Sequence, residues 1–301
     1  MNMQDEYICD YLVTAEKKRS NAVYVDLIDT FDSLCERAGI TYWVFCGALI
    51  GAVRHKGFVP WDDDIDVLMP RADFDRLLSM TNEEFGAEEP YFLQNPVTEP
   101  ACVQSLIRFR RSDTAEIRDY DLGYLRLHPN GKPYNMGFNL AIFPLDSYPK
   151  SQLVWKFQKN LTYTLRGIHY RSLTPKEGQS FQHRLCRAIV AVLGDKNMMK
   201  LIHWGYRMPR RVDPDRLQSF YGIFKTLDLW PASDFRETVR LPFEDTTIRA
   251  PIGYDDVLTR SYGNYMELPP VDKRVAKHDS YMNPDESYLQ VIDSVLADGI
   301  Q

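Results

Sequence analysis

Four aspartates in five positions, Asp62, Asp63, Asp64 and Asp66, stand at the start of an otherwise apolar run over residues 65–69. Like charges that lie close together repel, and proteins relieve this repulsion by binding a divalent cation or by raising carboxyl pKa values. The run is typical of a β-strand, and side chains two apart on a strand share a face. We therefore expect Asp64 and Asp66 to point the same way, and Asp62 to join them only if the strand begins early.

An Asp-rich loop taken alone would favour a solvated acidic turn, but its neighbours favour a binding site. Small residues come first, where a backbone can approach a ligand closely. The helix expected over 49–54 would aim its first N–H groups at a phosphate. Three cations and an aromatic residue follow. The candidate substrate contacts in this stretch are Gly47, Ala48, Arg54, His55, Lys56 and Trp61.

Residues 47–66, GALIGAVRHKGFVPWDDDID, resemble the signature of the LicD family. Members of that family are similar to fukutin-type phosphotransferases and belong to the nucleotidyltransferase superfamily. The superfamily pattern is a glycine and a small residue, then Asp-hydrophobic-Asp on the next strand, which here matches Gly47-Ala48 and Asp64-Ile65-Asp66. The resemblance implies a catalytic metal clamp of Asp64 and Asp66 for Mg²⁺ or Mn²⁺, with Asp62 as a further ligand.

Two later stretches agree with this resemblance. Residues 142–146 are similar to the family's second motif, and residues 262–270 are similar to its C-terminal motif. The resemblance implies that Tyr262, Arg274 and His278 contribute to the substrate site. A choline group would also favour an aromatic cage, for which Tyr262 is a candidate.

One position departs from the family pattern. The second motif usually carries an acidic residue where this chain has Ala141. The superfamily generally uses a third carboxylate from a neighbouring strand as a metal ligand or general base. Three explanations compete: an engineered inactive variant, a natural protein that has lost catalysis, and an active site organised differently. We favour the first, because the rest of the motif is intact. Asp146 is expected to begin the next loop and is no ready substitute.

Arg108 and Arg110 lie on or just after a strand expected over 103–109, and they would share one face. They could contact a phosphate, which makes Arg108 a candidate for substrate binding. A solvated edge strand explains the pair about as well.

The chain changes character near residue 150. We expect a nucleotidyltransferase-like catalytic core over 1–150, a mainly helical lobe over 151–253, and a C-terminal motif segment over 254–301 that packs back on the core. The fold class is α/β (α+β), a mixed sheet flanked by helices. Helices are expected over 20–39, 49–54, 72–80, 153–168, 181–193, 198–207, 216–224 and 254–262, and strands over 42–45, 64–69, 91–93, 103–109, 138–143, 241–243 and 247–250.

Composition narrows the location and the partners. The net charge of −6 over 301 residues argues against nucleic-acid binding. Five cysteines without CxxC spacing indicate reduced thiols, and no signal peptide or membrane span is visible, so we expect a cytoplasmic protein. The cluster Arg207, Arg210 and Arg211 beside Trp204 and Met208 could reach a lipid headgroup layer, which would put the protein at the inner face of the membrane. A solvated basic loop is the favoured interpretation.

The resemblance implies transfer of a phospho-alcohol group from a CDP-activated donor to a glycan hydroxyl. The best-known case is phosphocholine from CDP-choline onto a cell-surface glycan or teichoic-acid precursor, and the acceptor could be lipid-linked. Two alternatives remain: nucleotidyl transfer to a small molecule or sugar, which the same metal clamp would support, and a non-catalytic protein that binds a nucleotide or glycan.

Overall fold

The computed structural model describes residues 3–100, 106–128, 132–173, 180–209, 211–219, 229–275 and 280–299. Within these ranges the helices are α1 Ala15–Ala38, α2 Cys46–Arg54, α3 Arg71–Ser79, α4 Asn82–Phe85, α5 Asp119–Leu127, α6 Gln152–Leu173, α7 Phe181–Leu193, α8 Asp195–Arg207, α9 Tyr254–Tyr262 and α10 Tyr288–Asp298, with 3₁₀ turns η1 Ala232–Phe235 and η2 Val271–Lys273. The strands are β1 Glu6–Ile8, β2 Tyr11–Val13, β3 Trp43–Phe45, β4 Ile65–Pro70, β5 Tyr91–Gln94, β6 Ile107–Arg111, β7 Ala115–Arg118, β8 Phe138–Pro149, β9 Val212–Gln218, β10 Leu229–Pro231, β11 Thr238–Phe243, β12 Thr246–Pro251 and β13 Ser280–Asn283. The predicted α+β fold class is confirmed.

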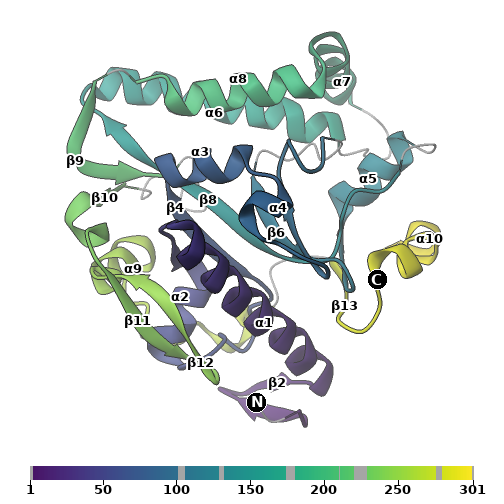
Figure 1. Cartoon of the computed structure of the whole chain (residues 1–301), viewed down its shortest axis with the longest axis vertical. Helices are drawn as coiled ribbons and strands as arrows, with labels where there is room; N and C mark the ends of the chain where they lie inside the picture. The colour runs from purple at the N-terminus through teal and green to yellow at the C-terminus, as the bar shows by residue number, and fades with distance from the viewer. Residues whose placement is uncertain are drawn as a thin grey trace.

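The main sheet is organised around the long strand β8. One edge of β8 pairs with β4 in parallel. Strand β8 also pairs antiparallel with β6 through residues 138–142 and with β9 through residues 146–149. The neighbours β3, β5 and β10 complete a seven-stranded mixed sheet, which Figure 1 shows running diagonally through the molecule. Because β8 pairs with three strands and a strand has only two edges, the sheet branches at β8.

Side chains alternate between an apolar and a polar face on the three central strands. Ile65 and Val67 of β4, Leu140 and Ile142 of β8, and Ile107 and Phe109 of β6 are all fully buried in one hydrophobic cluster. Helix α1 covers this face, and the ring centre of its Phe31 lies 5.3 Å from that of Phe109. The intervening residues therefore point to the opposite face, which is the face that carries the candidate site.

Helix α1 begins and ends at residues suited to those positions. The Thr14 side chain accepts a hydrogen bond from the N–H of Lys17 at 3.1 Å, which satisfies one of the free donors of the first turn. Gly39 ends the helix with a φ of 60°, in the left-handed region that glycine enters at little cost. The helix expected over 20–39 therefore ends where predicted, although it begins five residues earlier, at Ala15.

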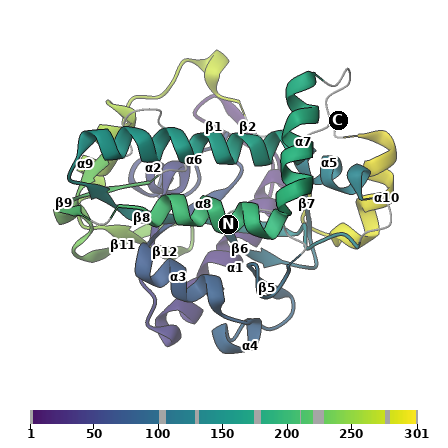
Figure 2. The same cartoon turned by 90° about the horizontal axis from the view of Figure 1, so that it is seen from above.

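Helices α6, α7 and α8 form a layer at one end of the molecule (Figure 1), with α6 and α8 side by side and α7 crossing them near one end (Figure 2). Leu165, Val190, Met198 and Ile202 form its interior, and Phe143 of β8 packs against them. Across the described ranges, no helix has both the length and the apolar character needed to span a bilayer.

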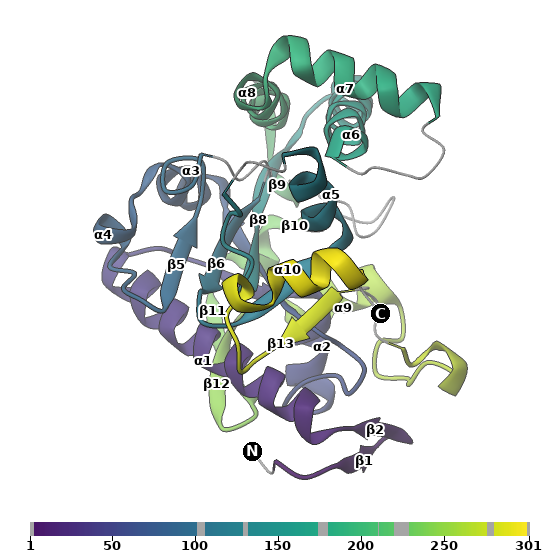
Figure 3. The ribbon, with the colours of Figure 1, turned by 90° about the vertical axis from the view of Figure 1, so that its right-hand side faces the viewer.

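The C-terminal strand β13 returns to pair antiparallel with β7, and α10 packs beside it, as Figure 3 shows from the side. The apolar residues Val291, Ile292 and Val295 of α10 share a cluster with Ala115 and Ile117 of β7. The last part of the chain thus fixes a strand that lies about 165 positions earlier in the sequence.

Several sequence expectations are wrong in detail. A helix was expected over 216–224, of which the structure describes residues 216–219. Residues 216–218 belong instead to the strand β9, Val212–Gln218. Asp146 does not begin a loop, because β8 continues to Pro149. Arg108 and Arg110 do not lie on a solvated edge, since β6 is flanked by β5 and β8. The strands β7 and β13 were not expected at all. In each case pairing with a distant strand decided the outcome.

Asp146 instead forms a buried ion pair with Arg71, the first residue of α3. Arg71 donates to the two carboxylate oxygens from Nε at 2.6 Å and from Nη2 at 2.8 Å. The Asp146 side chain is only 5% exposed, so that loss of the guanidinium would leave a buried charge without its strongest partner.

We expect Arg71→Met to lower the free energy of unfolding by roughly 3–5 kcal/mol, the usual cost of removing one partner of a buried pair. Urea denaturation followed by circular dichroism measures this loss. The control is Arg236→Met, because Arg236 is 69% exposed beside Glu237 and should change stability by less than about 1 kcal/mol. Equal stability of the two variants would contradict the structural role of the pair.

Candidate functional site

The turn from β3 into α2 lies against the acidic segment. Helix α2 begins at Cys46, three residues earlier than expected, and Cys46 has a φ of 51°. A Cβ atom at position 47 would overlap the carboxylate of Asp62. Asp62 therefore occupies the space beside the start of α2, and for this reason position 47 must be glycine. Ala48, one residue on, is buried in the main hydrophobic core.

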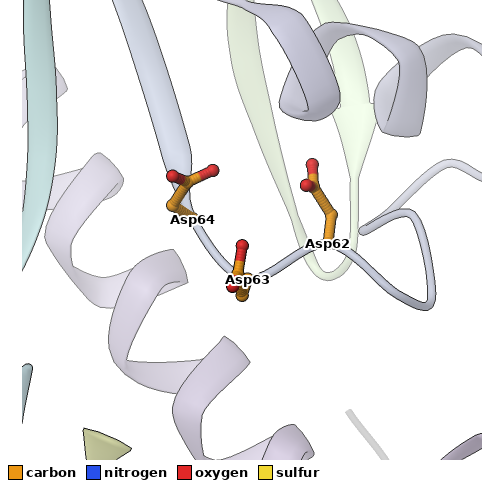
Figure 4. Close-up of side chains that lie close together, drawn as sticks. All are labelled: Asp62, Asp63 and Asp64. Atoms are coloured by element: carbon orange, nitrogen blue, oxygen red, sulfur yellow. The ribbon is translucent and has the colours of Figure 1, made fainter. Parts of the chain in front are cut away.

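Three aspartates cluster in the loop that leads into β4. Carboxylate oxygens of Asp62, Asp63 and Asp64 lie within 4.8 Å of one another, and Figure 4 shows their side chains gathered along the loop. Asp62 and Asp63 are 8% and 7% exposed. The strand itself begins only at Ile65, so the loop, not strand alternation, brings Asp62 to Asp64. No ligand role was predicted for Asp63, which lies in this cluster with Asp62 and Asp64.

Asp64 and Asp66 point into one cavity of about 170 Å³. This agrees with the expectation that they share a face. The described residues that line the cavity are Asp64, Asp66, Leu106, Arg108, Arg118, Asn139, Ala141 and Phe143. Burial raises the pKa of Asp66 well above its usual value, and Asp64 and Asp62 raise it further. Arg118 and Arg108 oppose this rise, and a further cation bound in the cavity would also favour the ionised carboxylate.

Ala141 lies in the middle of this wall. In the sheet register its Cα is paired with that of Asp66 on one side and with that of Arg108 on the other. Neighbouring positions of a sheet point to the same face, so a carboxylate at position 141 would enter the cavity between Asp66 and Arg108. The departure from the family pattern thus falls inside the site.

Two arginines supply positive charge to the cavity. Arg108 is 6% exposed and donates from Nη2 to the Tyr120 hydroxyl at 3.1 Å. Arg118 of β7 lies 3.7 Å from Asp64 and 2.6 Å from Glu116. Arg118 was missed from the sequence. The alternation of Glu116, Ile117 and Arg118 could have indicated a strand, but only the fold brings that strand to Asp64.

Two other side chains approach the acidic cluster from distant helices. Lys17 of α1 is close enough to interact with Asp63, Asp62 and Asp64, which oppose the lowering of its pKa by burial. Tyr262 at the end of α9 contacts Cys46, and burial together with Cys46 raises its pKa; Asp62 and Asp66 add to this. The C-terminal motif therefore does reach the site through Tyr262, whereas Lys17 had no recognisable sequence signal.

Other residues that were predicted to contact the substrate lie together in a group outside the cavity lining. Arg54 donates to the Tyr265 carbonyl at 2.7 Å and to Nε2 of His55 at 2.8 Å. Arg54 and Arg274 both lie near the ring of Trp61, with Cζ 5.9 and 5.7 Å from its centre. None of these side chains is among the described residues that line the cavity. Their contacts tie the C-terminal motif segment to α2.

His55 is not a cation at neutral pH, in contrast to its expected role. Burial and the neighbouring Arg54 lower its pKa to about 4, so the neutral ring accepts the hydrogen bond from Arg54. Lys56 is exposed and donates to the Val53 carbonyl at 3.0 Å. His278 lies outside the described residues.

Chemically, the arrangement combines hard oxygen donors with fixed cations. Carboxylate oxygens are the ligands that Mg²⁺ and Mn²⁺ prefer. Arg108 and Arg118 stand beside them, and arginine is suited to phosphate recognition. Acids and arginines around one cavity therefore fit an anionic ligand that carries a divalent cation.

The comparisons with known proteins agree with this site. Residues 39–128 match the family model described as LicD/FKTN/FKRP, nucleotidyltransferase domain. The chain is 27% identical over 267 residues to the lipopolysaccharide cholinephosphotransferase LicD of Haemophilus influenzae, covering 87% of this chain and 95% of that protein. It is 36% identical over 52 residues to the ribitol 5-phosphate transferase FKRP of human and of mouse, covering 17% of this chain and 10% of theirs.

The matched residues 39–128 include α2, β4 and the arginines of β6 and β7. The longer alignment extends this similarity beyond the acidic cavity to most of the chain. The resemblance expected from the sequence is confirmed: residues 39–128 match the LicD/FKTN/FKRP nucleotidyltransferase domain, within a chain that is similar to LicD over most of its length.

Proposed function

We propose that this chain transfers a phospho-alcohol group from a CDP-activated donor to a glycan hydroxyl. The donor we favour is CDP-choline, and the acceptor class is a cell-surface glycan or teichoic-acid precursor. Similarity to proteins named as a cholinephosphotransferase and a ribitol 5-phosphate transferase supports phospho-alcohol transfer in general. The observation that carries the proposal is the cavity in which Asp64 and Asp66 face Arg108 and Arg118.

The proposal includes a divalent cation, because the carboxylates of Asp62, Asp64 and Asp66 are suitable ligands for one. Asp64 and Asp66 would hold Mg²⁺ or Mn²⁺ from the cavity wall, and Asp62 lies next to Asp64 as a further ligand. When bound, the ion would neutralise part of the charge on the donor pyrophosphate. It would also offset the burial and the repulsion from Asp64 and Asp62 that raise the pKa of Asp66.

The arginines would act on the phosphates directly. Arg108 is buried and held by Tyr120, and Arg118 is held by Glu116. Both guanidinium groups are therefore fixed before a substrate arrives, which lowers the cost of stabilising charge that develops on the leaving nucleotide. This rigid placement favours a transferase over a site that only binds.

Ala141 limits the chemistry that this chain can perform. An acceptor hydroxyl becomes a better nucleophile when a positioned base takes its proton. Position 141 lies between Asp66 and Arg108, where a carboxylate could accept that proton or bind the metal. We propose that the present alanine impairs catalysis and leaves binding of the donor intact.

We also place the protein in the cytoplasm at the inner face of a membrane, where a lipid-linked glycan acceptor would be accessible. The support for this part of the proposal is the charge and the exposed apolar surface of α6–α8.

The first prediction concerns metal-dependent binding. Asp64→Asn should weaken binding of CDP-choline in the presence of Mg²⁺ by more than about tenfold, because even outer partners of a metal site are often worth that much. Isothermal titration with and without the metal measures the effect. Asp293→Asn is the matched control, because Asp293 lies exposed on α10. Metal-dependent binding that survives in the Asp64 variant would contradict the clamp.

The second prediction concerns position 141. Ala141→Asp should raise the rate of CMP release from CDP-choline by at least about a hundredfold, the usual range for a positioned base. Ala141→Asn has nearly the same shape without the charge and should remain at the level of the parent chain. The products also distinguish the reactions: choline phosphate on the acceptor supports the proposal, whereas CMP on the acceptor supports nucleotidyl transfer. A folded Ala141→Asp variant that is inactive with a range of CDP-alcohols would favour a non-catalytic binding protein.

A further inference from the structure

The layer of α6, α7 and α8 differs from the rest of the protein in charge. Residues 150–211 contain thirteen lysines and arginines but only two acidic residues, so this segment has a net charge of +11. The whole chain has a net charge of −6, and the remaining residues must therefore carry −17. Such an asymmetry within one acidic protein indicates a surface that meets an anionic partner.

The same layer exposes large apolar side chains on each of its helices. On α6, Leu153 and Phe157 are 78% and 60% exposed; on α7, Phe181 and Val192 are 72% and 87% exposed; on α8, Trp204 is 53% exposed. The interior of the layer is already filled by its own apolar cluster. These side chains are therefore additional to those needed for packing, and they lie on the same three helices as exposed lysines and arginines.

On α8 the two kinds of residue alternate along one exposed side. Lys196, Lys200, Leu201 and Trp204 are all exposed and are spaced by four, one and three positions, so that they follow one side of the helix. Arg207, at the end of α8, instead forms an ion pair with Asp75 of α3 at 2.6 Å. A Trp with flanking Lys and Arg residues is typical of helices that lie in the headgroup region of a bilayer.

At one end of the layer, where α6 begins and α8 ends, lies an open groove of about 580 Å³. Lys150 and Arg211 supply positive charge to it, and Val154, Met208 and Pro209 supply apolar surface. Arg210, which the sequence grouped with Arg211, lies outside the described residues. The groove combines cations for a phosphate with apolar surface for the adjoining part of a lipid.

We propose that the outer face of α6–α8 docks this protein on an anionic lipid bilayer, with the apolar side chains in the headgroup boundary and the lysines and arginines on lipid phosphates. A nucleic acid would use the cations but would leave Leu153, Phe157 and Val192 exposed to water. A lipid surface satisfies both kinds of side chain, because its charged and apolar regions lie within one side-chain length of each other.

The docking face is coupled to the cavity through packing. Phe143 and Leu106 line the cavity with Asp64 and Asp66, and both also pack against the apolar interior of the α6–α8 layer. Docking through the opposite side of that layer would hold the cavity at a fixed short distance from the membrane. This part of the inference rests on the proposed function, since it explains how a lipid-linked acceptor reaches the site.

Vesicle co-sedimentation without any nucleotide donor tests the docking itself. The full chain should bind vesicles of phosphatidylcholine with phosphatidylglycerol, should bind poorly to phosphatidylcholine alone, and should be released by salt. Charge neutralisation by Lys196→Gln or Lys200→Gln should weaken binding by about fivefold each. Lys273→Gln, on η2 and exposed, is the matched control and should have no effect.

The apolar contribution has its own variants. Leu153→Ser with Phe157→Ser should reduce binding at high salt as well as at low salt, whereas Val271→Ser, at a site 61% exposed on η2, should not. Circular dichroism verifies that each variant is folded. Equal binding to both vesicle types, or variants that bind like the parent chain, would overturn the proposal. So would light scattering that shows a dimer dissociated by Trp204→Ser with no vesicle binding. Donor binding in solution is measured separately, so that failure of docking and failure of the proposed chemistry are distinguishable.

Discussion

The parallel pairing of β4 with β8 is the contact on which the candidate site depends. It sets Asp66 beside Ala141, and the pairing of β8 with β6 then sets Arg108 on the other side of Ala141. The opposite faces of these strands are apolar and packed under α1. A slip by one residue would turn the apolar side chains into the cavity and the charged ones into the core. Burial under α1 therefore fixes which residues face the cavity.

Cations from several parts of the fold offset the repulsion among the four aspartates. Arg118 reaches Asp64 from β7, and Lys17 interacts with the cluster from α1. Strand β7 is in turn paired by β13 near the end of the chain. The charge balance of the site therefore depends on segments from both ends of the sequence. Burial, together with Asp64 and Asp62, raises the pKa of Asp66, and Arg118 and Arg108 oppose that rise.

The layer of α6, α7 and α8 adds a second surface to the core that carries the candidate site. Its interior packs on Phe143 and Leu106 at the cavity, while its helices expose basic and apolar side chains. A transferase that modifies a lipid-linked glycan must bring a water-soluble donor and a membrane-bound acceptor together. The two faces of this layer, one at the cavity and one outside, are suited to that geometry.

The sequence by itself determined the local features. The glycine turn, the acidic loop, the alternation on β4 and β8, the end of α1 and the extent of α7 follow from spacing that involves neighbours only a few positions apart. It also revealed that position 141 lacks the expected acid. Only the tertiary structure decided that Asp63, Arg118 and Lys17 approach the acids, that Arg54 and Arg274 instead hold a separate segment around Trp61, and that Asp146 is an internal ion-pair partner. These outcomes depend on contacts between segments far apart in the chain, such as β7 with β13 and α1 with the acidic loop. No local periodicity encodes which distant segment lies alongside.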